Sequence, residues 1–210
     1  MLSREAIDAL GELCIEHNLW LVCDEVYEHL TFGVDFASPL ENPALRERTI
    51  VTSSISKTFA ATGFRSGWTI GPADFSRRLL PISESMLFGN QPFIADMTTA
   101  ALRGDFDTAE KMRISFSRRA KLIHDALKTA PGLSAWLPQG GMFIMVDVSG
   151  TGMDGETFAW RLLKEQAVAV MPGNSFGSTA DGLIRIALTV PDEILSTAME
   201  RMVELARAGQ

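Results

Sequence analysis

The chain has 210 residues, of which 46% are hydrophobic and 21% charged, and it carries a formal net charge of −7 with a pI of about 5.0. This composition is that of an ordinary globular protein, and it offers no basic excess to attract nucleic acid or an anionic membrane surface. The apolar runs are much shorter than a membrane span, and the charged N-terminus does not resemble a signal peptide, so we expect a cytoplasmic protein.

The chain contains two cysteines, Cys14 and Cys23, both in apolar stretches. We expect free thiols in a reducing compartment, with a disulfide or a shared metal ion as less favoured alternatives. The histidines, His17, His29 and His124, do not show the spacing of metal ligands, so no metal site is expected.

The N-terminal region predicts a helix followed by a buried strand. Ser3 is suited to cap a helix that begins at Arg4 and ends near residue 17, with an apolar face formed by Ile7, Leu10, Leu13 and Cys14. The run Leu19–Cys23 is apolar throughout and bounded by polar residues, which favours a fully buried strand of a parallel sheet. Acidic residues follow directly, at the sheet edge where ligands collect in open α/β folds.

The remaining elements divide the chain into two regions of different character. In the first region the patterns predict strands over 49–53 and 67–70 and helices over 74–80, 92–102 and 106–130, with Pro81 breaking or restarting a helix. In the second region they predict strands over 133–137, 142–148, 168–171 and 183–188 and helices over 155–166 and 191–208. We therefore expect an α/β domain over 1–110 and an α+β domain with an antiparallel sheet over 111–210.

One lysine stands out in the loop between the strands predicted at 49–53 and 67–70. Lys57 has hydroxyl neighbours at Ser54 and Ser56, and Arg65 follows eight positions later. An isolated lysine is most often a solvated surface charge. At the edge of an α/β sheet, however, it can form a Schiff base with a carbonyl cofactor, of which pyridoxal phosphate is the common example.

Pyridoxal phosphate makes demands that neighbouring residues can meet. Ser54, Ser56 and Arg65 provide hydroxyls and a permanent cation for its phosphate. Asp24 follows the buried strand and can keep the pyridine nitrogen protonated, while Tyr27 can donate to the phenolic oxygen. The alternatives are that Asp24 caps a turn and that Tyr27 is a packing aromatic.

The two motifs together resemble a known family. D-E-x-Y at 24–27, followed by S-x-S-K at 54–57 and G-x-R-x-G at 63–67, is similar to the class I/II pyridoxal-phosphate-dependent aminotransferases, which have the fold type I of aspartate aminotransferase. The segments 140–143, 172–177 and 183–187 resemble later motifs of that family. More weakly, the chain is similar to the arginine–pyruvate transaminase subgroup.

The resemblance implies a fold and a reaction. Residues 1–110 would be the C-terminal part of the large cofactor-binding domain, and 111–210 the small domain. The reaction would move an amino group from an amino acid to a 2-oxo acid, with Lys57 as Schiff-base lysine and proton carrier. Arg185 would bind the substrate α-carboxylate, although its alternation with isoleucines in a strand would otherwise favour a solvent-facing side chain. The full-length form would be a homodimer.

The family's front half, which includes its Gly-rich phosphate turn, has no counterpart in this sequence. We therefore expect half of the cofactor pocket to come from another polypeptide or to be lost. The alternatives to an aminotransferase are a lyase or decarboxylase of the same fold, a non-catalytic regulatory module, and an inactive fragment.

Overall fold

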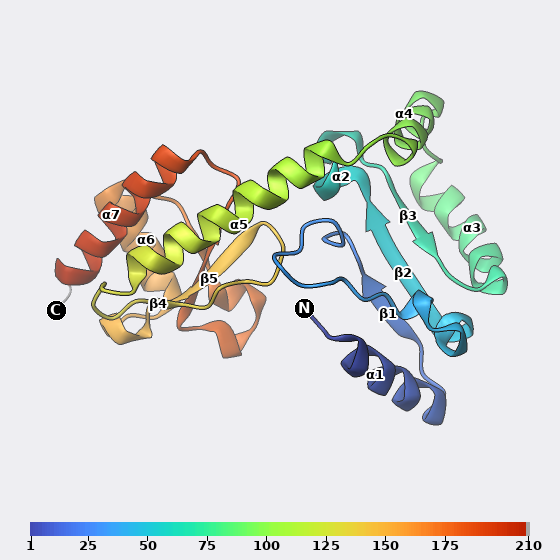
Figure 1. Ribbon diagram of the computed structural model, residues 1–210, viewed down its shortest axis with the longest axis horizontal. Coiled ribbons are helices and arrows are strands. Elements are labelled where there is room, and N and C mark those ends of the chain that lie inside the picture. Colours follow the sequence, from blue (N-terminus) through green and yellow to red (C-terminus); the bar gives the residue numbers. More distant parts are fainter. Residues whose placement is uncertain (209–210) are drawn as a thin grey trace. The chain divides into compact units, whose positions relative to one another are not determined.

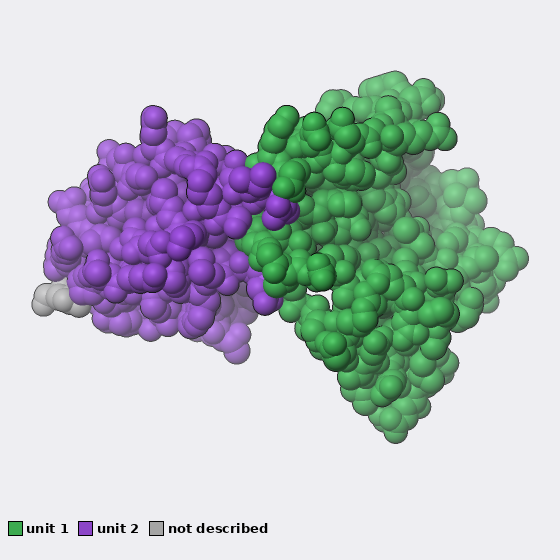
Figure 2. Space-filling model, in the orientation of Figure 1, with its two compact units in different colours: residues 1–112 green, residues 113–210 purple. Residues whose placement is uncertain are grey.

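The computed structural model describes residues 1–208, and the chain divides into two compact units, Met1–Met112 and Arg113–Gln210 (Figure 2). The helices are α1 (Arg4–Glu16), α2 (Ile55–Thr58), α3 (Ala73–Leu87), α4 (Pro92–Arg103), α5 (Asp107–Leu127), α6 (Gly155–Gln166) and α7 (Asp192–Ala208). The strands are β1 (Leu21–Asp24), β2 (Thr49–Ser54), β3 (Gly67–Ile70), β4 (Ser134–Ala135), β5 (Phe143–Asp147), β6 (Met171–Pro172) and β7 (Leu183–Ala187) (Figure 1).

The first unit contains a three-stranded sheet in the order β1-β2-β3. β1 runs parallel to β2, with Asp24 opposite Thr52, and β3 runs antiparallel to β2, with Gly67 opposite Ser54. The central strand β2 is buried over most of its length, whereas β1 and β3 are the outer strands. The mixture of a partly parallel sheet with helices confirms the predicted α/β class.

Helix α1 begins as predicted but packs on a different face. The side chain of Ser3 caps it by accepting from the Ala6 N–H at 3.3 Å. Of the predicted apolar face, Ile7 is buried and Cys14 is half-buried, but Leu10 and Leu13 are 41% and 49% exposed, so the prediction is wrong for these two leucines. Gly11 is buried instead, because the side chain of Leu45 occupies the space where a Cβ at Gly11 would lie.

The prediction that the first strand is fully buried is also wrong. Along β1 the exposure alternates, and Val22 is 63% exposed while Leu21 and Cys23 are half-buried. β1 is an outer strand, so side chains that point away from the unit's interior remain in solvent. Trp20, just before the strand, is likewise exposed.

Helix α3 continues through Pro81 rather than breaking there. Proline removes one backbone donor, which leaves the carbonyl one turn earlier, at Arg77, without its helical partner. Arg77 has a side chain that is 77% exposed, and water can reach this surface of the helix. The carbonyl of Pro81 itself accepts from the Ser85 hydroxyl at 2.8 Å.

The second unit contains a four-stranded sheet in the order β4-β5-β7-β6, in which every pairing is antiparallel. Its core side chains come from β5, β7 and helices α5, α6 and α7, and the fully buried ones include Ile123, Ile144, Phe158, Leu162, Ile184, Leu195 and Met202. The last outer strand is shorter and later than the predicted 168–171. The N–H of Val168 donates to the Leu162 carbonyl at 3.3 Å, so this residue completes the end of α6 instead.

Among the described residues, no helix combines the length and the apolar character that crossing a bilayer would require.

Candidate functional site

The sheet of the first unit brings three polar segments to one end. Asp24 ends β1 beside Thr52 of the parallel strand β2, and the Glu25 N–H extends this pairing by donating to the Thr52 carbonyl at 2.9 Å. β2 ends two residues later at Ser54, which lies opposite Gly67 at the start of β3. The segments 24–27, 54–57 and 65–67 therefore lie at the carboxyl end of the two parallel strands (Figure 1).

Lys57 is held by a short helix that begins where β2 ends. The Ser54 hydroxyl caps α2 by accepting from the Ser56 N–H at 3.2 Å. The Lys57 side chain is half-buried, and within residues 1–208 its amine has no hydrogen bond or ion pair. An amine that is fixed by its backbone but has no partner is available to a ligand.

Arg65 adopts a left-handed backbone conformation, with φ of 52°. For a residue with a Cβ this conformation is unfavourable by about 1–2 kcal/mol, and such residues are often found at functional sites. One guanidinium nitrogen, Nη1, donates to the Thr62 carbonyl at 2.9 Å, and the side chain is exposed.

The backbone after Arg65 packs tightly against β2 and α2. A Cβ at Gly67 would lie 2.7 Å from the Ser53 carbonyl oxygen, so this close approach requires glycine. The Ile55 N–H donates to the Ser66 carbonyl at 3.3 Å. Ser66 is buried, and its hydroxyl is 2.7 Å from that of Thr98 on α4, so α4 supports the segment that carries Arg65. The role of Thr98 could not be predicted from the motifs, because this residue lies far from Ser66 in the sequence.

The neighbouring acidic residues Asp24 and Glu25 differ in burial. Asp24 is exposed, and its Oδ1 accepts from the Val26 N–H at 3.2 Å, which is the turn-capping arrangement considered as the alternative. Glu25 is buried, and its Oε1 accepts from the Ser38 hydroxyl at 2.8 Å. Burial raises the pKa of Glu25, and the nearby Glu28 adds to this effect. Tyr27 is half-buried in the turn that follows.

In the second unit, Arg185 lies on the side of β7 opposite the core. Its neighbours Ile184 and Ile186 are buried, whereas Arg185 is half-buried. Its guanidinium carbon lies 4.6 Å from the centre of the Phe176 ring and 5.3 Å from that of Phe143. No hydrogen bond or ion pair of this guanidinium to another described residue occurs. The donors of the planar fork are thus available for a carboxylate.

Residues 1–202 match the protein family described as aminotransferase class I and II. The chain belongs to this family. The match confirms the family-level prediction drawn from the motifs at 24–27, 54–57 and 63–67.

The chain is 40% identical over 201 residues to the arginine–pyruvate transaminase AruH of Pseudomonas aeruginosa, and the matched region covers 96% of this chain and 51% of that protein. It is 32% identical over 206 residues to an aspartate aminotransferase of Musicola paradisiaca, covering 97% of this chain and 52% of that protein. The structure of an aromatic aminotransferase from Pyrococcus horikoshii superimposes with a TM-score of 0.95 at 31% identity, covering 99% of this chain and 56% of that chain.

These comparisons confirm the predicted fold type I of aspartate aminotransferase. They also show that this class I and II aminotransferase chain spans about half the length of the curated relatives that it matches.

The donor set at the sheet end fits pyridoxal phosphate, the cofactor associated with this family. Ser54 and Ser56 present hydroxyls and Arg65 an exposed guanidinium, which together suit a phosphate. The unpaired amine of Lys57 suits an aldehyde. Asp24 adds an exposed carboxylate that suits a protonated ring nitrogen.

Proposed function

We propose that this chain is the part of a pyridoxal-phosphate-dependent aminotransferase that carries the reactive lysine, and that the whole protein transfers an amino group from an amino acid to a 2-oxo acid. The observation that carries the proposal is the half-buried Lys57, whose amine has no partner within residues 1–208, at the sheet end where Asp24, Ser54 and Arg65 also lie. Membership of the class I and II aminotransferase family supports it.

Six residues of the first unit would hold the cofactor. Ser54, Ser56 and Arg65 would bind its phosphate, Asp24 its ring nitrogen, Tyr27 its phenolic oxygen, and Lys57 its aldehyde carbon. When bound, pyridoxal phosphate supplies an electron sink that stabilises negative charge on the substrate Cα. To bind the ring nitrogen, the Asp24 carboxylate would have to share or give up the hydrogen bond that it accepts from the Val26 N–H.

Two residues would act on the substrate itself. Lys57 would remove the proton from the substrate Cα as a general base and later return a proton as a general acid. Arg185 would bind the α-carboxylate through its planar fork, which orients the Cα–H bond for this transfer. The Phe143 and Phe176 rings near the guanidinium support this role, since they limit its movement while leaving its donors available.

The two units suit the domains predicted from the sequence. We propose that Met1–Met112 is the C-terminal part of the large cofactor-binding domain and that Arg113–Gln210 is the small domain. The whole protein is proposed to act as a homodimer in the cytoplasm. The free thiols of Cys14 and Cys23 support a reducing compartment.

Cofactor trapping on the purified chain tests the proposal. The chain is mixed with pyridoxal phosphate, its absorbance is recorded, and sodium borohydride then fixes any cofactor carried on a lysine. We expect peptide mass spectrometry to find the label on Lys57, and Lys57→Ala to lose both the label and the absorbance band. Lys164→Ala, which removes an amine from the second unit, serves as the matched control.

Labels distributed equally over all lysines would contradict the role of Lys57. In a full-length form of the protein, we expect Lys57→Ala to abolish turnover. Normal single-turnover transamination by that variant would contradict the proposed general base.

A further inference from the structure

Three aromatic rings from separate segments of the first unit contact one another in series. The centre of the His29 ring lies 4.4 Å from that of Phe106, and the rings are inclined at 33°. The Phe59 ring lies on Phe106 as well, at 5.4 Å and 42°. The distance between Phe59 and Phe106 is within the range of favourable aromatic pairs, and the His29 ring lies slightly closer to Phe106 than that range. Phe106 is the common member, and we call these three residues the aromatic cluster.

The outer members of the cluster flank proposed site residues. His29 follows Tyr27 by two positions, and the Tyr27 carbonyl accepts from the Leu30 N–H at 2.9 Å, so both belong to one turn. Phe59 follows Lys57 by two positions and is the C-cap of α2, where its N–H donates to the Ile55 carbonyl at 3.2 Å. The His29 and Phe59 rings are therefore attached to the backbone segments that carry Tyr27 and Lys57.

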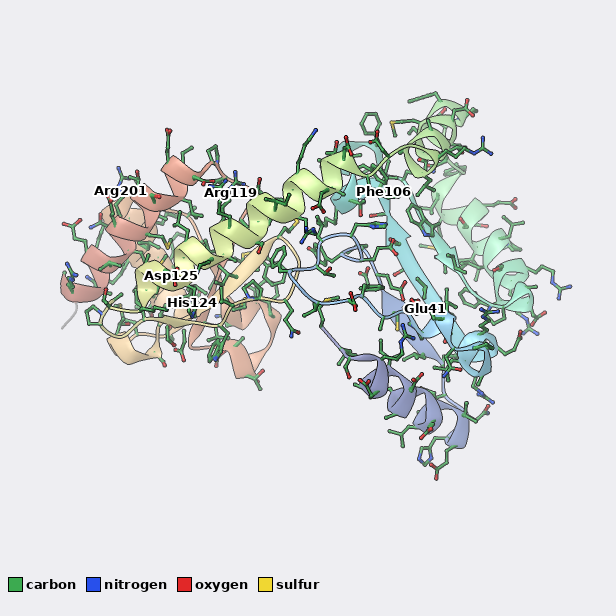
Figure 3. All side chains as sticks on the ribbon, viewed as in Figure 1. Glu41, Phe106, Arg119, His124, Asp125 and Arg201 are labelled. Atoms are coloured by element: carbon green, nitrogen blue, oxygen red, sulfur yellow. The ribbon has the colours of Figure 1, made fainter. Side chains whose placement is uncertain are left out.

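Phe106 is itself fixed by the start of the long helix. Its carbonyl accepts from the Glu110 N–H at 2.9 Å, and Ala109 in the first turn of α5 is 2% exposed. Figure 3 labels Phe106 at this end of α5, close to α2. The Phe106 ring is half-buried, so it is held by its neighbours and by its backbone together.

Lys57 depends on its backbone for its position. Within residues 1–208, no partner holds its amine, and the helix that carries it has only four residues. Sheet pairing fixes β2 up to Ser54 but does not extend to Lys57. Ile55 and Thr58 of α2 are buried, and the contact of Phe59 with Phe106 adds support at the far end of the helix.

We propose that Phe106 is a positioning residue for the cofactor site, which holds the segments of Lys57 and Tyr27 in a fixed arrangement through Phe59 and His29. This inference rests on the proposed function, because it assumes that Lys57 receives the cofactor. The proposed role of Phe106 is indirect, because it would act through the two rings beside it and not by contact with the reacting groups.

The experiment measures how fast pyridoxal phosphate and borohydride label Lys57 in the 210-residue chain. Labelling of Lys164 in the same sample is the internal reference. Phe106→Ala is expected to lower the ratio of Lys57 to Lys164 labelling about tenfold, since small misplacements of reacting groups have large effects on rate. Phe106→Tyr keeps an aromatic ring and should retain the ratio of the unaltered chain.

Two further variants separate positioning from loss of stability. Phe106→Leu preserves apolar volume, so it tests the aromatic contact even if the alanine variant unfolds. Phe75→Ala removes a ring from a separate aromatic pair of this unit, Trp20 and Phe75 at 6.1 Å, and should leave the ratio unchanged. Circular dichroism and thermal unfolding of each variant record whether the fold is kept.

The outcomes distinguish this inference from the proposed function. If the unaltered chain labels Lys57 no faster than Lys164, the proposed function fails and the inference falls with it. If the unaltered chain is selective and folded Phe106→Leu is equally selective, only the positioning role is overturned. A ratio that falls in Phe75→Ala as far as in Phe106→Leu would also overturn it, because general packing would then explain the effect.

Discussion

At the scale of single residues, burial separates two neighbouring carboxylates. Asp24 remains in solvent at the end of β1, while Glu25 turns inward to Ser38. A carboxylate that is removed from water favours its protonated form, which raises the pKa of Glu25. The folded state therefore binds a proton at Glu25 more tightly than the unfolded chain does, and the stability of the fold depends on pH through this residue.

We predict that Glu25→Gln changes this pH dependence. The unaltered chain should lose stability relative to the variant as pH rises from about 4.3, the ordinary value for glutamate, through the raised pKa of Glu25, and the difference should then level off. Glutamine can still accept from the Ser38 hydroxyl, so the hydrogen bond is kept. Urea unfolding at a series of pH values measures the difference.

The control for this prediction is Glu16→Gln, which removes the same charge from an exposed position on α1. A stability difference between Glu25→Gln and the unaltered chain that stays constant from pH 4 to pH 8 would show that Glu25 has the same proton affinity in the folded and unfolded states.

Local motifs predicted where the candidate residues lie in the fold, but not what surrounds them. The segment 54–57 and Arg65 lie at the expected sheet end because strand, cap and turn signals are all short-range. Glu25 and Ser38 are separated by 13 positions, and the burial of Glu25 depends on how the intervening loop folds back. The packing of Phe106 could not be predicted from local motifs either, because its two ring partners lie far away in the sequence.

At the scale of elements, an ion-pair network links α5 to the start of α7. The Arg119 Nε donates to Asp192 Oδ1 at 2.8 Å, and its Nη1 donates to the Leu188 carbonyl at 2.8 Å. Arg118 also contacts Asp192. The Arg119 side chain is only 16% exposed, so solvent screens this pair less than it screens most surface pairs.

We predict that Asp192→Ala lowers the free energy of unfolding by about 1–3 kcal/mol, because it removes charged hydrogen bonds and leaves a poorly solvated guanidinium. The matched control is Asp74→Ala on α3, whose pair with Arg78 at 2.8 Å is highly exposed. Loss of the control pair should cost about 0–1 kcal/mol. Urea denaturation of both variants makes the comparison, and equal effects would contradict the stabilising role of the network.

The ends of helices agree with the sequence-based prediction where a residue suited to start or stop a helix marks them. Ser3 starts α1 as predicted, and α4 begins at Pro92 as predicted and ends at Arg103, one residue after the predicted end. The continuation of α3 through Pro81 was not predicted, because an exposed helix can leave the Arg77 carbonyl to solvent. The outer strand β6 was also misplaced, because the residues before it complete α6.

At the scale of the whole molecule, the order of fold classes along the chain was predictable, but exposure was not. A partly parallel sheet precedes an antiparallel one, as the periodicities indicated. An apolar pattern shows that a side chain can be buried, whereas the neighbouring elements decide whether it is. Val22 remains 63% exposed on the outer strand, and Trp20 remains 54% exposed although its ring lies 6.1 Å from that of Phe75 on α3.

The position of β1 and β3 at the outside of their sheet has a consequence for handling the protein. Each strand presents backbone donors and acceptors on the side away from β2, and exposed outer strands of this kind pair readily with strands of other molecules. We expect the isolated chain to form oligomers that grow with concentration, as light scattering after size-exclusion chromatography would show. Val22→Lys should reduce this association, while Ile114→Lys, at an exposed site on α5, should have less effect. A monomer at every concentration would mean that both strand edges are protected against intermolecular pairing.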